Sequence, residues 1–468
     1  MTGDRTNSAA DLLVPLDRTG AGGPLHRQLE ASIRDGIRSG RLAAGSALPP
    51  SRALAASLGV SRGVVVTAYE QLTAEGYLTS RSGGYTTVAA RAAGGAAVPP
   101  PVAPPPARIS FGYGRTDVSQ FPRAAWLRSV RRVLTTAPSD RFGYTSGQGT
   151  PELRAALAAY LNRVRGTDAH PDTVVICAGY AQAANLLVQV LRSDGSTRLA
   201  VEDPSADDDV RALAAAAGMS VVGVPVGPDG VDVAALSTVD ADALVLTPSH
   251  QWPTGGVLPA AARAAVIRWA ASRDALVIED DYDAEYRYDR AAVGAMQGLA
   301  PDRVAYVGSA SKTLAPGLRL GWMVLPPRLV APVVEAKVLA DRGSPAIDQL
   351  TFADFLGCGE FDRHLRRMRP LYRRRRDVLL AALARHLPQL RPAGVAAGQH
   401  LVAWLPPHLS EPVVESAALA RGLSVLGVGR YRIAPGPPGL LFGYGSLSER
   451  AIEEGVTLLA AALADGAG

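Results

Sequence analysis

Residues 304–321 read VAYVGSASKTLAPGLRLG, an apolar run followed at once by serines, a lysine and an arginine. The apolar run predicts a buried strand, and ligands of α/β proteins bind at the loops that leave such strands. Lys312 is one of two lysines among 48 basic residues, the other being Lys337. Arginine serves equally well on a solvated surface, but only an amine can form a Schiff base with an aldehyde. The motif therefore indicates chemistry at Lys312.

Short apolar segments of this kind alternate with alanine-rich amphipathic stretches over residues 109–466. The apolar segments include DTVVIC, ALVLT and ALVIED, and PELRAALAAYLNRV is one of the amphipathic stretches. This alternation predicts an α/β domain with a mainly parallel sheet and helices on both of its faces.

Polar groups near the lysine suit a phosphate ester that carries an aldehyde, and pyridoxal phosphate is such a molecule. Ser309, Ser311 and Arg319 offer two hydroxyls and a cation for the phosphate. The strand in ALVIEDDYDAEYRY leads into Asp280 and Tyr282. A carboxylate there can keep the pyridine nitrogen protonated, and a phenol can hydrogen-bond the 3′-oxygen. We therefore expect these five side chains to bind the cofactor.

The glycine turn in CAGYAQAANLL supplies a further phosphate-binding feature, because the helix after such a turn has unpaired amides and a positive end. The candidate amides belong to Tyr180 and Ala181. Each of these pieces alone is common without a cofactor, and their order is more specific. Glycine turn, TPSHQWPTGG, EDDYD and SASKTLAPGLRLG together resemble the fold type I aminotransferase superfamily over residues 109–466. That resemblance implies pyridoxal phosphate as a Schiff base with Lys312 and a homodimer, in which Tyr144 of YTSGQGTPELR reaches the partner's cofactor phosphate.

Residues 22–88 have a different pattern, which predicts three short helices and a hairpin. Apolar residues recur at helical spacing, in turn, at Leu25, Leu29, Ile33 and Ile37, at Leu54 and Leu58, and at Val64, Ala68 and Leu72. Ser61 is expected to cap the third helix, and YLTSRSGGYTTVA to form two strands that turn at residues 82–84. This order of elements is typical of a winged helix-turn-helix.

The third helix of this unit has the size to enter a DNA major groove. Arg52, Ser61, Arg62 and Arg81 are the predicted contacts, because an arginine fork can grip either a phosphate or the edge of guanine. A winged helix that binds another protein is the alternative.

The run LPPSRALAASLGVSRGVVVTAYEQLTAEGYLTSRSGGYTTVA resembles the DNA-binding domain of the GntR superfamily. The resemblance implies a double-stranded DNA operator as partner. It places on that DNA Arg52, Ser61 and Arg62, and a wing made of Arg81, Ser82 and Gly83.

Alanine and proline dominate residues 89–108, which predicts a semi-rigid spacer. The predicted organisation is a DNA-binding domain over 22–88, a linker over 89–108, and an effector and dimerisation domain over 109–466. This fusion resembles the MocR/GabR-type subfamily of bacterial transcriptional regulators. That resemblance implies a small-molecule effector as a further partner.

The cofactor site departs from the aminotransferase pattern at the position before Pro-Thr-Gly. Trp252 stands where aminotransferases have an asparagine that binds the cofactor oxygen. His250 or Gln251 is the candidate substitute. In EDPSADDD, Ala206 stands where relatives have tyrosine, and the acids at 207–209 would repel a carboxylate.

A second departure concerns the substrate. Leu440 occupies the place of the arginine that binds a substrate carboxylate in relatives, and Arg430 or Arg432 is the candidate substitute. Transamination needs its amino acid held by this carboxylate. We therefore predict a sensor with no assigned catalytic residue, whose effector is pyridoxal phosphate itself or an amine or amino acid. A working aminotransferase with an appended DNA-binding domain, and a structural dimer without cofactor, are the alternatives.

Composition limits the remaining possibilities. The chain of 468 residues is 47% hydrophobic and 19% charged, which is typical of globular domains, and its net charge of +5 falls well short of a histone-like excess. No apolar stretch approaches the roughly 18 residues of a membrane span, and the N-terminus lacks a signal sequence, so we expect a cytoplasmic protein without membrane contact. Cys177 and Cys358 are too few for a disulfide framework and lack the spacing of metal ligands.

Overall fold

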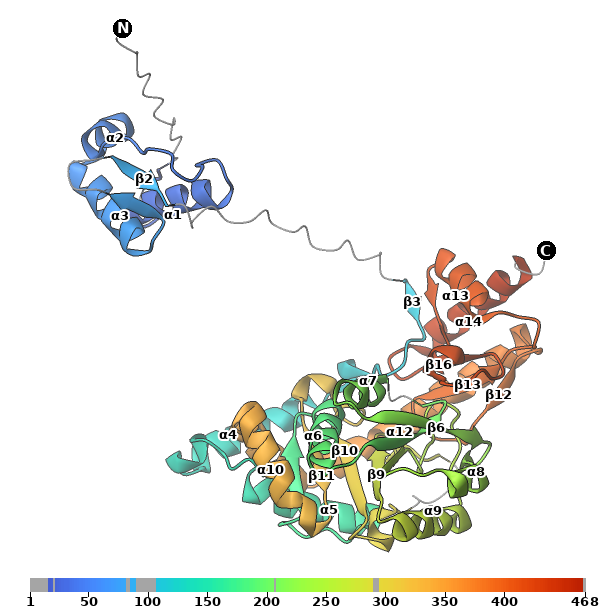
Figure 1. The fold of residues 1–468 in the computed structure, drawn as a ribbon. Helices are drawn as coiled ribbons and strands as arrows, with labels where there is room; N and C mark the ends of the chain where they lie inside the picture. Colours follow the sequence, from blue (N-terminus) through green and yellow to red (C-terminus); the bar gives the residue numbers. More distant parts are fainter. Residues whose placement is uncertain are drawn as a thin grey trace. The chain divides into compact units, whose positions relative to one another are not determined.

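The computed structural model describes residues 16–19, 22–80, 85–89, 107–205, 208–288 and 294–465. The chain divides into two compact units, Met1–Pro104 and Pro105–Gly468 (Figure 1). Each unit is described by itself.

The small unit contains three helices and a two-stranded sheet. The helices are α1 (Leu25–Arg38), α2 (Ser51–Leu58) and α3 (Arg62–Ala74), and the antiparallel strands are β1 (Leu78–Ser80) and β2 (Thr86–Val88). Glycine ends α2 as expected, because Gly59 adopts the left-handed conformation with a φ of 60°. The winged helix-turn-helix fold predicted from the sequence is confirmed.

Two details of α3 differ from the sequence prediction. Val65 is fully buried whereas Val64 is half-buried, so the buried face is Val65, Ala68, Tyr69 and Leu72. Tyr69 belongs to this buried face although the sequence prediction did not include it. Its hydroxyl donates to the carbonyl of Pro49 at 2.9 Å. Ser61 occupies the N-cap position, but its side chain makes no capping hydrogen bond. The predicted cap is therefore wrong, and Ser61 is exposed to solvent.

The large unit is built on an eight-stranded sheet with the order β4-β11-β10-β9-β8-β5-β6-β7. The strands are, in that order, Val174–Cys177, Gly321–Val324, Val304–Ser309, Leu276–Asp281, Ala243–Leu246, Arg198–Asp203, Ser220–Gly227 and Gly230–Val231. In this sheet β11 and β7 run in the direction opposite to the other six strands. The predicted α/β class with a mainly parallel sheet is confirmed.

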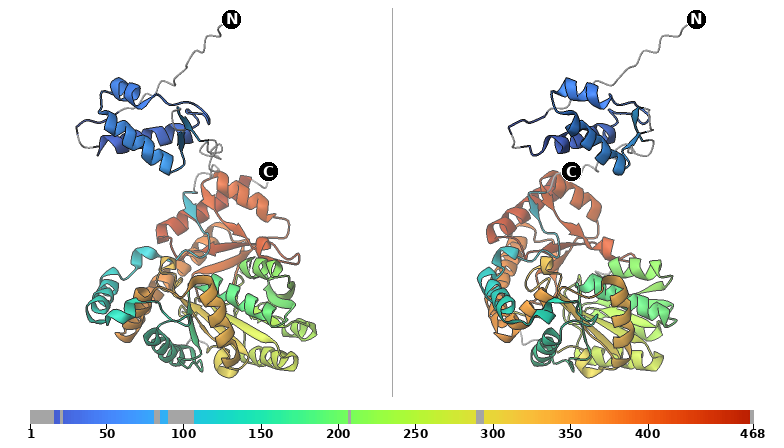
Figure 2. Two further views of the ribbon diagram at one scale, coloured as in Figure 1. Left: turned by 60° about the vertical axis from the view of Figure 1, so that its left-hand side comes forward. Right: turned by 90° about the vertical axis from the view of Figure 1, so that its left-hand side faces the viewer.

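Helices cover both faces of this sheet, because alternate residues of each strand face opposite layers (Figure 2). In β10, Ala305 and Val307 pack with α6 (Tyr180–Ser193), α7 (Asp208–Ala216) and α10 (Pro327–Asp341). Tyr306 and Val304 face the other layer. That layer contains α5 (Pro151–Arg165), α8 (Val233–Thr238), α9 (Ala260–Arg273), α11 (Ala346–Gly357) and α12 (Glu360–His386).

A smaller antiparallel sheet completes the large unit. Its strands, in order, are β12 (Arg391–Ala393), β13 (His400–Trp404), β16 (Gly439–Gly443) and β15 (Leu426–Gly427). β3 (Ile109–Ser110) pairs in parallel with β14 (Leu423–Ser424). The remaining helices are α4 (Arg123–Thr136), α13 (Glu411–Ala420) and α14 (Glu449–Asp465). Short 3-10 helices lie at Val118–Gln120, Ser139–Phe142, Gln297–Leu299, Pro316–Leu318 and Val428–Tyr431.

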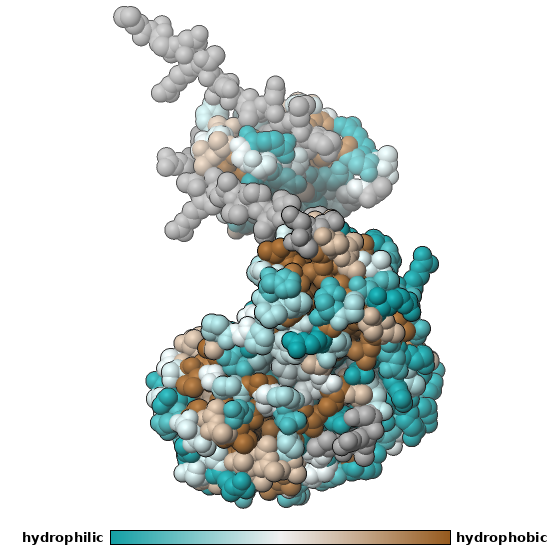
Figure 3. All heavy atoms as spheres, turned by 90° about the vertical axis from the view of Figure 1, so that its right-hand side faces the viewer, coloured by the Kyte–Doolittle hydropathy of each residue, from teal (hydrophilic) through white to brown (hydrophobic). Residues whose placement is uncertain are grey.

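Hydrophilic and hydrophobic residues are intermixed over the face of the large unit in Figure 3. Among the described helices, none combines the length and the apolar character needed to span a bilayer.

Candidate functional site

Lys312 lies in the loop after β10, close to the N-terminal residues of the large unit. Its Nζ donates to the carbonyl oxygen of Gly114 at 3.3 Å and lies 4.9 Å from the ring centroid of Tyr113. Burial lowers the pKa of Lys312 below its usual range, and the carboxylates of Asp280 and Asp283 oppose this shift. A lysine with a lowered pKa has more neutral amine at a given pH, which is the nucleophilic form.

Asp280 and Tyr282 lie at the same edge of the sheet as the lysine. β9 and β10 are parallel, and Asp280 is paired with Val307 two residues before the end of β10. The Tyr282 hydroxyl donates to the carbonyl of His250 at 2.8 Å. Burial raises the pKa of Tyr282 well above its usual range, so this phenol stays protonated and can donate.

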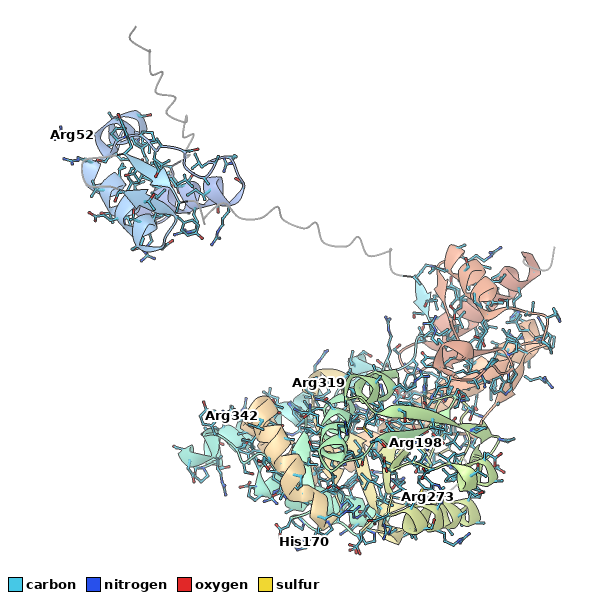
Figure 4. The ribbon with its side chains drawn as sticks, in the orientation of Figure 1. Arg52, His170, Arg198, Arg273, Arg319 and Arg342 are labelled. Carbon is cyan, nitrogen blue, oxygen red and sulfur yellow. The ribbon has the colours of Figure 1, made fainter. Side chains whose placement is uncertain are left out.

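Arg319 lies beside the N-terminus of α6, the feature predicted for phosphate binding (Figure 4). Gly179 precedes the helix with a φ of 103°, and a Cβ built on it would lie 3.5 Å from Nη2 of Arg319. A Cβ on Gly321 would lie 2.6 Å from Cα of Gly179, so the close approach of the two segments requires glycine at position 321. The amides of Tyr180 and Ala181 belong to the first turn of α6, where N–H groups point out of the end of a helix. This arrangement suits a phosphate.

The two serines lie between β10 and the lysine. Ser309 is the last residue of β10, and its Oγ accepts a hydrogen bond of 3.4 Å from the amide of Ser311. An amine, a carboxylate, a phenol and an arginine beside a helix N-terminus therefore meet at one end of the sheet. These groups fit pyridoxal phosphate, which needs an amine for its aldehyde and a cation for its phosphate.

Of the two candidate substitutes for the missing asparagine, only one has an unused group. Gln251 donates to the carbonyl of Pro204 at 2.9 Å and accepts from the amide and hydroxyl of Thr254 at 3.0 and 2.7 Å. His250 Nδ1 lies 3.0 Å from Asp283, while its buried Nε2 has no hydrogen-bond partner among the described residues. His250 is therefore the better candidate. Trp252 is buried, and its ring centroid lies 3.4 Å from that of Tyr113.

Arg430 and Arg432, the candidate substitutes for the carboxylate-binding arginine, both interact with other side chains. Leu440 is fully buried on β16, opposite Ala403. Arg430 forms an ion pair with Glu415 at 3.1 Å. The guanidinium of Arg432 lies 5.9 Å from the ring centroid of Trp404. Ala206 and Asp207 lie outside the described residues.

A buried ion pair lies at the end of β9, next to the predicted cofactor ligands. Arg165 Nε donates to Asp281 Oδ2 at 2.7 Å, and both side chains are almost fully buried. The Tyr306 hydroxyl donates to the same oxygen at 2.8 Å, and Arg165 Nη2 donates to Ser249 at 3.0 Å. Because Asp281 lies between Asp280 and Tyr282 in the chain, this network anchors the backbone between the two predicted cofactor ligands.

One histidine near the site, His400, was not assigned from the sequence. Burial lowers the pKa of His400 well below its usual range, so this imidazole is neutral. One ligand atom each of His250, Asp283 and His400 come within 4.8 Å of one another. These residues come from three distant segments, so their spacing in the sequence gives no signal.

His364 holds the residue after the lysine, and its burial predicts an acid-sensitive fold. Its Nε2 lies 2.9 Å from the carbonyl oxygen of Thr313. Burial lowers the pKa of His364 to about 4. Between about pH 6.5 and pH 4 the unfolded chain therefore binds the extra proton, and stability falls as the pH falls. We expect this histidine to lower the free energy of unfolding by about 2 kcal/mol when the pH falls from 7.5 to 5.

Urea unfolding of the wild type and His364→Gln at both pH values measures this cost. The loss of stability between pH 7.5 and pH 5 should be smaller in the variant. An equal loss in the two proteins would contradict the assignment.

Tyr144 is 98% exposed in its own chain. It follows the short helix Ser139–Phe142, whose Phe142 is also exposed. The predicted role of Tyr144 in the site of a partner subunit therefore stays a prediction.

The predicted DNA contacts are exposed where the structure describes them. Arg52 is the second residue of α2, and Ser61 and Arg62 stand at the start of α3 (Figure 4). Arg81, Ser82 and Gly83 lie outside the described residues.

Comparison with known proteins assigns both units. Residues 25–88 match the bacterial regulatory proteins of the gntR family, and residues 109–415 match the class I and II aminotransferases. The chain is 35% identical to the probable rhizopine catabolism regulatory protein MocR of Rhizobium meliloti, over 96% of each chain. It is 34% identical to the HTH-type pyridoxine biosynthesis transcriptional regulator PdxR of Corynebacterium glutamicum, over 90% of this chain and 92% of that one.

Among solved structures, LysN, an α-aminoadipate aminotransferase from Thermus thermophilus in complex with N-(5′-phosphopyridoxyl)-L-leucine, is 29% identical. It has a TM-score of 0.70 and covers 76% of this chain and 92% of its own. Matches of this length to regulators, and of this kind in both units, leave no other assignment: the chain belongs to the gntR family of bacterial transcriptional regulators, in the MocR-type group that joins a winged helix-turn-helix to an aminotransferase-like domain.

Proposed function

We propose that this regulator binds pyridoxal phosphate at Lys312 and changes its affinity for operator DNA in response to that cofactor or to an amine that reacts with it. One observation carries the proposal. The lysine amine, Asp280 and the pair made by Arg319 and the α6 N-terminus meet at one end of the sheet, in a chain with Leu440 in place of the substrate-binding arginine.

Each predicted ligand has a separate task toward the cofactor. When bound, pyridoxal phosphate supplies an aldehyde and an electron-withdrawing ring. Asp280 would keep the pyridine nitrogen protonated, and the Tyr282 hydroxyl, which here donates to the carbonyl of His250, would donate to the 3′-oxygen instead. The phosphate is held by a cation, two hydroxyls and the amides of the first helical turn, which belong to Arg319, Ser309, Ser311, Tyr180 and Ala181.

The effector is pyridoxal phosphate or an amine or amino acid, and the domain acts as a sensor. A relative is named for the regulation of pyridoxine biosynthesis, which favours the cofactor itself as effector. Because Leu440 is buried among apolar residues, a substrate carboxylate finds no cation at that position.

A binding assay with a product assay beside it tests the proposal. DNA recovered from genomic fragments bound by the full-length protein is labelled, and its affinity is measured with and without pyridoxal phosphate and candidate amines. We expect a change in affinity without repeated release of a keto product. Many turnovers with unchanged DNA affinity would favour the working aminotransferase instead.

The active form is a homodimer in the cytoplasm, where chromosomal DNA is accessible. A two-fold dimer carries two copies of the winged helix and so reads a repeated DNA site. In this dimer Tyr144, exposed in its own chain, contacts the cofactor phosphate of the partner subunit.

The start of α3 is the most sensitive part of the DNA-binding surface. We expect Arg62→Ala to weaken operator binding by about 1–3 kcal/mol if the arginine reads a base, because a lost bidentate base contact costs this much. Fluorescence anisotropy at one fixed salt concentration measures the change. Arg268→Ala, at an exposed position on α9, is the matched control and should bind as the wild type does. Equal affinities for wild type and Arg62→Ala would remove Arg62 from the interface.

A further inference from the structure

A short stretch of chain follows the linker and contacts Lys312. This connecting segment, residues 107–117, begins with β3, whose Ile109 amide donates to Gly422 O at 3.1 Å. The Phe111 amide then donates to Ser424 O at 2.9 Å, and the Phe111 carbonyl accepts from Gly443 at 2.8 Å. Backbone hydrogen bonds to β14, to Gly422 before it and to β16 thus fix the first half of the segment.

The second half of the connecting segment holds the lysine amine directly. The Gly114 carbonyl accepts from Lys312 Nζ, and the ring of Tyr113 lies within the distance of about 6 Å at which a cation is attracted to an aromatic face. Gly114 has a φ of 85°, and a Cβ there would lie 3.1 Å from Nζ. Both its conformation and its closeness to the amine therefore call for glycine.

Other contacts of the segment involve the backbone around the lysine and not its amine. Thr116 donates to the carbonyl of Ser311 at 3.1 Å and to Gln399 at 3.3 Å, and Gln399 in turn donates to the carbonyl of Lys312 at 2.7 Å. Asp117 is held by Arg375 at 2.7 Å in a buried ion pair. These contacts do not involve the amine, so the groups of the connecting segment that contact it directly are Tyr113 and Gly114.

We propose that Tyr113 and Gly114 hold Lys312 while its amine is free, and that attachment of the cofactor releases them and so signals to the linker. This inference rests on the proposed function. The neutral amine forms a C=N bond with the aldehyde carbon, and the aldehyde oxygen leaves as water. A free ammonium has three N–H donors, whereas the nitrogen of the C=N bond has at most one, which faces the cofactor. The hydrogen bond to Gly114 is then lost, and the cation–π contact with Tyr113 is weakened because any remaining positive charge is spread over the C=N bond and the cofactor ring.

Release of this stretch has a direct route to the DNA-binding unit, because the connecting segment continues in the chain as the linker. A ligand shifts an equilibrium between two arrangements only if it interacts differently with each. Here the difference is the pair of contacts made by the free amine, of which one is lost and the other weakened in the second arrangement.

Hydrogen exchange of the full-length protein measures the release itself. We expect amides of residues 111–115 to exchange faster once pyridoxal phosphate has produced its visible absorbance band, while amides of α9 stay unchanged. Unchanged or slower exchange in residues 111–115, with the band present, would overturn the inference. Absence of the band from the wild type would instead overturn the proposed function.

Two substitutions of the lysine separate release from mere loss of the cofactor. Neither Lys312→Ala nor Lys312→Arg can form the band, but arginine keeps a cation and donors for Tyr113 and Gly114. Without cofactor, we expect the DNA affinity of Lys312→Ala to shift toward that of the cofactor-loaded wild type. On a logarithmic scale, this shift should be at least half of the difference between the unloaded and the loaded wild type. Lys312→Arg should match the unloaded wild type. Equal DNA affinities for the two variants would overturn the inference.

Gly114 provides a third variant, one that leaves the lysine itself unchanged. Gly114→Ala should weaken the hold on the amine and shift the unloaded protein part of the way toward the loaded affinity. Gly112→Ala is the matched control, because Gly112 does not have a positive φ and a Cβ there would approach only the Ser110 hydroxyl, at 3.1 Å. A larger shift in Gly112→Ala than in Gly114→Ala would count against the assignment.

Discussion

Lys312→Ala is expected to abolish the visible absorbance band that forms when the protein is incubated with excess pyridoxal phosphate. The amine is the group that bonds to the aldehyde, and its burial lowers the pKa of Lys312 and so favours the reactive neutral form. Absorbance spectroscopy after removal of free cofactor measures the loss, which should be complete.

The other lysine of the chain provides the control. Lys337 is fully buried on α10, and its Nζ donates to Asp341 at 2.6 Å. Lys337→Met should therefore keep the full band, since methionine fills the same buried space without the amine. A band that persists in Lys312→Ala, or one that disappears only in Lys337→Met, would show that the wrong lysine has been assigned.

Asp281→Asn is expected to destabilise the large unit by about 3–5 kcal/mol, because it leaves the buried charge of Arg165 without its partner. Replacing the carboxylate also weakens its hydrogen bond with Tyr306. Chemical denaturation followed by circular dichroism measures the change in unfolding free energy. Cofactor affinity should fall as well, since Asp280 and Tyr282 flank this residue.

Asp274→Asn removes the same charge from an exposed ion pair. Asp274 lies 2.7 Å from Arg303 and its side chain is 89% exposed. Asparagine also tolerates the φ of 52° at this position. The loss should be far smaller than that of Asp281→Asn, as for other surface pairs. Similar losses in the two variants would mean that burial does not set the cost at Asp281.

The sequence predicted the parts of the site that lie close to a strand end. Lys312, Asp280 and Tyr282 follow apolar runs directly, and parallel strands bring such residues to one edge. The winged helix was predictable for a similar reason, since its helices and turns each have a local signal. The structure places Val65 on the buried face of α3 in place of Val64, because adjacent valines fit a helical period almost equally well.

The remaining parts of the site depend on contacts between distant segments. Gly114 and Lys312 are 198 residues apart, and Arg165 and Asp281 are 116 apart. No local pattern marks such partners, because they meet only when the sheet and the N-terminal segment have assembled. The choice between His250 and Gln251 was open for the same reason, since it depends on the contacts of Gln251 with Pro204 and Thr254.

A single titration tests most directly whether the state of Lys312 sets DNA affinity. Pyridoxal phosphate is added stepwise to the full-length protein with labelled operator DNA, and visible absorbance and fluorescence anisotropy are recorded from the same sample. The predicted result is a change in DNA binding that follows the absorbance band with the same midpoint and is absent from Lys312→Arg. A band that forms fully while the anisotropy stays constant would contradict it.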